Sequence, residues 1–114
     1  GQLDGIIAGE KAMARINFTS LKCVRKQDVV GKDEAEIWID DEKKWDGVFK
    51  KGETAVLIPL YAEFDKTVKV QVKERNPNNT KTLGTKTIYA GQPDPQPVHF
   101  KTSGAHYELT YSLS

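Results

Sequence analysis

"KTVKVQVKE", residues 66–74, alternates strictly between apolar and polar side chains. Successive side chains of a β-strand point to opposite faces, so this period of two predicts an antiparallel strand with one buried face. The buried face carries Val68, Val70 and Val72, and the polar face carries Lys69, Gln71 and Lys73.

Two further segments repeat this alternation. "HYELTYSL", residues 106–113, places Tyr107 and Leu109 on one face and His106 on the other. "RINFTSLKCV", residues 15–24, alternates too, but its second half is one residue out of phase with its first. An extra residue in one strand of a pair produces such a slip, so we expect a β-bulge near residues 19–20.

The remainder of the chain is divided into short β-prone segments by turn residues. About eight strands, spaced at roughly 8 to 15 residues, predict an all-β, antiparallel sandwich or barrel. Pro59 lacks a backbone N–H, and therefore its segment is expected to be a kinked or edge strand. The other predicted strands are "AEIWID" (35–40), "KKWDGVF" (43–49), "TAVLIPLY" (54–61), "LGTKTIYA" (83–90) and "PVHFKT" (97–102).

The chain has 114 residues, enough for one domain with one core. Residues 1–12 show no period of two, and we expect them to be a terminal arm, a linker or a cloning remnant. The domain itself is expected to span residues 13–114. With 38% hydrophobic and 29% charged residues, the composition is that of a soluble globular protein.

The residue inventory argues against several functions. The net charge of +1 gives no electrostatic basis for nucleic-acid binding. Cys23 is the single cysteine, so there is no internal disulfide, and a buried thiol is expected. His99 and His106 are the only histidines, too few with one cysteine for a typical catalytic zinc centre. No serine lies in a nucleophile motif, and we expect no enzymatic activity.

An acidic loop offers a possible cation site. Asp28, Asp33 and Glu34 surround Gly31, and calcium prefers six to eight oxygen ligands of this kind. A second loop at residues 74–81 would complete the cage with Glu74 and Asn76 if both loops meet at one end of the sandwich. The alternative is that both loops are charged turns in water.

The sequences of both loops and their flanking strands also resemble those of a known family. "LKCVRKQDVVGKDEAEIWID" (21–40) and "VKVQVKERNPNNTKTLG" (68–84) resemble the C2-type β-sandwich family, and bacterial C2-like accessory modules in particular. The resemblance implies a Greek-key β-sandwich with calcium-binding loops. Calcium-binding members have an Asp-rich second loop, whereas residues 74–81 contain mainly amides and two cations. Any calcium affinity is therefore expected to be weak.

Exposed aromatic side chains are a second indication of binding. Trp38 is expected to face away from its neighbours Ile37 and Ile39, and Trp45 lies in a charged hairpin. Tyr61 flanks a turn. Such side chains suit a glycan or a protein partner, although a tryptophan on a small sandwich more often caps the core.

The leading hypothesis is a non-catalytic module that recognises a protein, glycan or membrane surface through loops at one end of the sandwich. The alternative is a structural or self-assembling subunit that uses an edge strand, such as residues 68–72, and the apolar residues 6–8 of the arm. The cellular location stays open, with a secreted or surface-associated protein favoured.

Overall fold

The structure is a computed structural model that describes residues 13–26 and 32–114. The described residues form nine β-strands and no helix, which confirms the all-β prediction. The predicted arm, residues 1–12, lies outside the described residues. The strands are β1 (Ala14–Arg25), β2 (Asp33–Ile39), β3 (Glu42–Phe49), β4 (Thr54–Val56), β5 (Tyr61–Phe64), β6 (Thr67–Arg75), β7 (Thr80–Tyr89), β8 (Val98–Lys101) and β9 (His106–Leu113).

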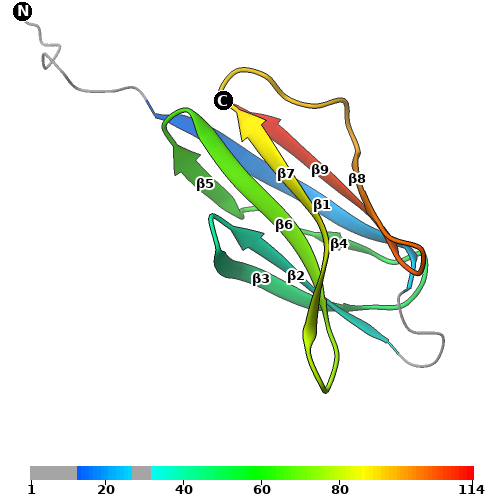
Figure 1. The fold of residues 1–114 in the computed structure, drawn as a ribbon. Helices are drawn as coiled ribbons and strands as arrows, with labels where there is room; N and C mark the ends of the chain where they lie inside the picture. Colours follow the sequence, from blue (N-terminus) through cyan, green and yellow to red (C-terminus); the bar gives the residue numbers. More distant parts are fainter. Residues whose placement is uncertain (1–12, 27–31) are drawn as a thin grey trace, which may run out of the picture.

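The strands form two antiparallel sheets that pack face to face as a Greek-key sandwich (Figure 1). One sheet, called the β1 sheet here, has the order β4-β1-β9-β8, with β5 also paired to β1. The other, called the β6 sheet, has the order β3-β2-β6-β7. Four pairs of consecutive strands lie in the same sheet, and three of them, β2-β3, β6-β7 and β8-β9, are hairpins.

The core lies where the alternating strands predict it. Val68, Val70 and Val72 are all at most 1% exposed and face the β1 sheet. In β1 the pairing with β9 shifts between Phe18 and Ser20, which confirms the predicted bulge. The bulge restores the phase of the strand, so that Leu21 and the free thiol of Cys23 are buried together with the residues before it.

One predicted strand is split in two. Residues 54–61 form β4 and β5, separated by the segment that contains Pro59. Both short strands pair with β1 at one edge of its sheet, so Pro59 occupies an edge as predicted. The split explains why there are nine strands rather than about eight.

Candidate functional site

The described residues of the two loops predicted to bind calcium lie at the same end of the β6 sheet. Glu34 in β2 pairs directly with Arg75 in β6, which places the start of β2 beside the end of β6. Asp33 and Asn76 occupy the next positions outward. Asp28 lies outside the described residues.

The side chains of these loops nevertheless point in different directions. Asp33 and Glu74 face the core and are fully buried, whereas Glu34 is exposed on the outer face of the sheet. Asn76 stabilises its own turn, because its Oδ1 accepts hydrogen bonds from the backbone N–H groups of Asn78 and Asn79. Asp33 and Glu74 therefore share the core side of the β6 sheet while Glu34 is on the outer side, and calcium binding stays a prediction.

Asp33 belongs instead to a polar group inside the sandwich. The Tyr107 hydroxyl donates a 2.9 Å hydrogen bond to Asp33 Oδ2, and the Tyr107 ring packs edge-on against Phe49. Burial raises the pKa of Tyr107 and of the neighbouring Cys23 thiol above their ordinary values. These protonated, enclosed groups are structural in character.

Neither tryptophan presents a free ring. Trp38 does face away from Ile37 and Ile39 as predicted, but the Lys73 ammonium lies 3.7 Å from the centre of its ring. Its indole N–H also donates a 2.8 Å hydrogen bond to Glu36 Oε1. The cation and the carboxylate thus occupy one ring face and the polar edge of Trp38.

Trp45 is half-buried rather than exposed. Its ring contacts Phe49 at a centroid distance of 5.9 Å and lies over Gly47, where an added Cβ would be 2.4 Å from Trp45 Cη2. Trp45 therefore covers the core at the β3 edge, which is the structural alternative considered for it above.

Tyr61 does lie on an accessible surface. It is 52% exposed, and Val56 (74%) and Ile58 (65%) are two further exposed apolar side chains within the same six residues of sequence. A hollow here is lined by Arg15, Asn17, Phe18, Ile58, Pro59, Leu60 and Tyr61. We call this group, Val56, Ile58, Pro59 and Tyr61, the Tyr61 surface.

Polar side chains border the Tyr61 surface in fixed positions. The guanidinium carbon of Arg15 lies 4.2 Å from the centre of the Tyr61 ring, and Arg15 Nη2 forms a 3.0 Å ion pair with Glu63 Oε2. These contacts follow from pairing in the sheet, because Arg15 is opposite Glu63 and Asn17 is opposite Tyr61. The surface thus combines an apolar centre with an ordered polar rim.

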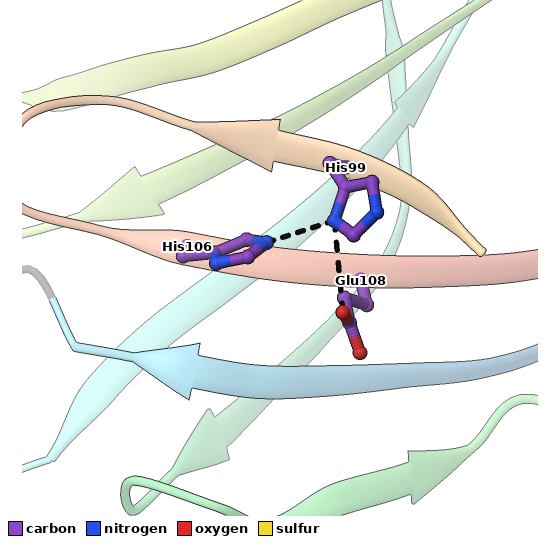
Figure 2. Close-up of side chains that lie close together, drawn as sticks. All are labelled: His99, His106 and Glu108. Atoms are coloured by element: carbon purple, nitrogen blue, oxygen red, sulfur yellow. Dashed lines mark hydrogen bonds and ion pairs between the residues drawn. The ribbon is translucent and has the colours of Figure 1, made fainter.

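A third group of side chains lies on β8 and β9. Figure 2 shows His99, His106 and Glu108 turned toward one another on the outer face of the β1 sheet. His99 Nδ1 lies 2.9 Å from His106 Nε2 and 3.6 Å from Glu108 Oε2. Within residues 13–26 and 32–114, this is the group whose ligand atoms are close enough to hold one metal ion, all within 4.8 Å.

Partial burial and the neighbouring His99 lower the pKa of His106 from its ordinary value. Sequence reasoning placed both histidines on strands but did not bring them together. The signal was present: the short turn around "SGA" (103–105) predicts a hairpin, and a hairpin puts His99 beside residues 106–108.

Comparison of the chain with models of protein families, with curated proteins and with solved structures found no match. The part of the chain that the structure describes contains no helix with the length and apolar character needed to cross a membrane.

Proposed function

We propose that the protein is a non-catalytic binding module that recognises a protein partner through the Tyr61 surface. The observation that carries this proposal is the exposure of three large apolar side chains, Val56, Ile58 and Tyr61, on one short segment. Protein interfaces have an apolar centre and a polar rim, and this surface has both. Tyrosine and arginine are also the residues most enriched among those that dominate binding energy.

The chemistry of the surface favours a polypeptide over a glycan. Val56 and Ile58 are aliphatic, and aliphatic side chains complement apolar side chains of a protein. Sugar rings stack on flat aromatic faces, but Lys73 covers Trp38, Trp45 lies against the core, and Arg15 covers one face of Tyr61. A membrane surface is less favoured because the net charge is only +1.

The ordered rim supports a preformed site. Arg15 contacts both Tyr61 and Glu63 before any partner binds, so these contacts already favour one orientation of its exposed side chain. The contacts lie on paired strands of the β1 sheet rather than on the end loops. The proposed interface is therefore at the β4–β5 edge, in place of the loop-end interface expected from the sequence.

A peptide-display selection tests this proposal. Random peptides of about 12 residues, enough to cover an extended binding groove, are selected on the wild type. We expect recovered peptides to be rich in apolar residues and to bind Ile58→Asp at least about 30-fold more weakly, as for a residue at an interface centre. Val48→Asp is the matched control, because Val48 is, like Ile58, an exposed β-branched apolar residue (57%) but lies on β3 in the other sheet.

Two results would contradict the proposal. One is recovery of no peptide above background, and the other is equal binding to the wild type and Ile58→Asp. Sedimentation velocity at high micromolar concentration adds a third test. Self-association that Ile58→Asp abolishes would show that the surface binds a second copy rather than a separate partner.

The structure changes which strands could pair with a second copy in the self-assembly alternative. Residues 68–72 lie in β6, which pairs with β2 on one side and β7 on the other, and so offer no free edge. Self-assembly would instead use the outer strands β3, β4, β5, β7 or β8. Residues 6–8 of the arm lie outside the described residues.

Weak calcium dependence remains part of the proposal for the loop that contains Asp28. Support comes from the pairing of Glu34 with Arg75 at the end of β6, and from the resemblance to C2-type sandwiches. Thermal melting in millimolar calcium tests it, with Asp28→Asn as the comparison. A melting temperature unchanged by calcium in the wild type would exclude the metal.

A further inference from the structure

We propose that His99, His106 and Glu108 form a binding site for a divalent transition-metal ion, with Zn²⁺ as the ion to test first. The three side chains lie on the outer face of the β8–β9 hairpin, on different strands from the Tyr61 surface (Figure 2). Nothing in the proposed recognition of a protein partner depends on this site.

Strand pairing fixes the positions of all three ligands. His99 is directly opposite Glu108, and His106 is two residues before Glu108 on the same face of β9. The intervening residues Phe100 and Tyr107 face the core and are at most 1% exposed. Because those buried rings set the phase of both strands, the two imidazoles and the carboxylate must all point outward on one side.

The distances between ligand atoms suit a metal ion. Zinc binds imidazole nitrogen and carboxylate oxygen at about 2.0–2.2 Å, so neighbouring ligand atoms in a tetrahedral site lie roughly 3.4 Å apart. The distances here, 2.9 Å from His99 Nδ1 to His106 Nε2 and 3.6 Å from His99 Nδ1 to Glu108 Oε2, fall on either side of that value. Small rotations of exposed side chains would close the difference.

The donor set also selects the class of ion. Imidazole nitrogen suits Zn²⁺, Cu²⁺, Ni²⁺ and Co²⁺, whereas Ca²⁺ and Mg²⁺ require mostly oxygen ligands. Two histidines and one carboxylate supply three ligands, and the 48% exposure of the His99 side chain leaves room for a fourth from solvent or from a bound molecule.

The neighbouring charges moderate the expected affinity. Lys101 is opposite His106, and Lys22 on β1 is opposite Glu108. Both cations lower the local attraction for a divalent ion. We therefore expect binding weaker than that of enclosed structural zinc sites. The alternative to a metal site is that the two imidazoles only form a hydrogen bond with each other. In that case the protein should not bind a metal ion here.

Isothermal titration of the whole chain with ZnCl₂, after treatment with a chelator, measures the binding. We expect one ion per chain. Loss of a residue that only hydrogen-bonds to a metal ligand costs roughly 10–100-fold in affinity. Loss of a ligand itself should cost more, so His99→Ala and His106→Ala should each weaken zinc binding by about 100-fold or more. Glu108→Gln should weaken it by at least about tenfold. Thr110→Ala, on the same face of β9, is the matched control and should bind as the wild type does.

Cobalt gives a readout that does not depend on stability. Co²⁺ bound to two nitrogens and an oxygen in a tetrahedral site has visible absorption bands that aqueous Co²⁺ lacks. These bands should appear in the wild type and Thr110→Ala and be absent from both histidine variants. Melting each variant in chelator confirms that it is folded.

Three results would overturn the proposal. The first is no zinc binding at millimolar concentration. The second is zinc binding that the histidine variants leave unchanged, which would place the ion elsewhere. The third is a Glu108→Gln variant with wild-type affinity, which would remove the carboxylate from the site.

Discussion

The Tyr107 hydroxyl joins the two sheets of the sandwich by a 2.9 Å hydrogen bond to Asp33 Oδ2. Tyr107 lies in β9 of the β1 sheet and Asp33 begins β2 of the β6 sheet, and both are fully buried. A polar contact across an apolar core favours one relative position of the layers, because a shifted arrangement would separate the donor from its acceptor.

Replacing Tyr107 by phenylalanine tests the contribution of this bond. Tyr107→Phe keeps the ring that packs against Phe49 but deprives a buried carboxyl group of a donor. We expect a loss of about 1–3 kcal/mol in the free energy of unfolding, measured by urea denaturation. Tyr89→Phe is the control, since Tyr89 is 53% exposed, and its free energy of unfolding should stay within about 0.5 kcal/mol of wild type. Equal stability of both variants would show that the bond contributes nothing.

Stability should fall at alkaline pH. Burial raises the pKa of Cys23 above 9.0 and those of Tyr107 and Tyr111 above 10.0. The folded protein therefore keeps protons that the unfolded chain releases. Their contribution to stability is complete below about pH 9 and is lost as the pH rises above the unfolded values of about 9 to 10.

Urea denaturation at pH 8 and at about pH 10.5 measures this loss. The decrease should be smaller in Tyr107→Phe, which has no phenol to ionise at this position, and unchanged in Tyr89→Phe. A wild-type free energy of unfolding that is the same at both pH values would contradict the expected role of burial.

Adding one methyl group at Gly47 should displace Trp45. In Gly47→Ala the new Cβ would lie 2.4 Å from Trp45 Cη2, so the indole must move away from the backbone that it covers. We expect a red-shifted tryptophan emission and a loss of about 1–3 kcal/mol in the free energy of unfolding, as for other overpacked sites. Gly52→Ala separates this effect from that of a methyl group in general. An added Cβ there meets no atom within 4 Å, although the positive φ of 88° at Gly52 carries its own cost. Emission that is unchanged in Gly47→Ala would contradict the position of Trp45.

The fold could be predicted from the alternation of apolar and polar side chains, because each sheet of a sandwich buries one face and exposes the other. Residues 66–74 and 106–113 predicted their buried faces correctly, and the phase slip in β1 correctly predicted a bulge. Pro59 correctly marked an edge. These features are local, so they can be read from neighbouring residues.

The same alternation also predicts that two acidic residues are buried, although we expected them to be exposed because they are charged. Glu74 is in phase with Val68, Val70 and Val72, and Asp33 is in phase with Ile37. Phase therefore placed both carboxyl groups in the core, whereas charged residues are seldom fully buried. Their assignment to a calcium loop followed the general preference for exposure, but in this protein the phase of the strand decided their positions.

The surface groups were harder to predict than the fold because they depend on how the strands pair. The cluster of His99 with Glu108 requires the register of the β8–β9 hairpin, and the contact of Arg15 with Tyr61 requires β5 to pair with the start of β1. Register between strands depends on turn geometry and on the complementarity of whole faces rather than on local composition.

The central claim is that a protein partner binds at the Tyr61 surface, and amide chemical-shift mapping tests it most directly. The ¹⁵N-labelled protein is titrated with a peptide from the selection. The largest shifts should fall on residues 56–63 and on Arg15 and Asn17, and Ile58→Asp should abolish them. Largest shifts around Trp38 and Lys73, or in the turn at residues 76–79, would place recognition on another surface and contradict the account.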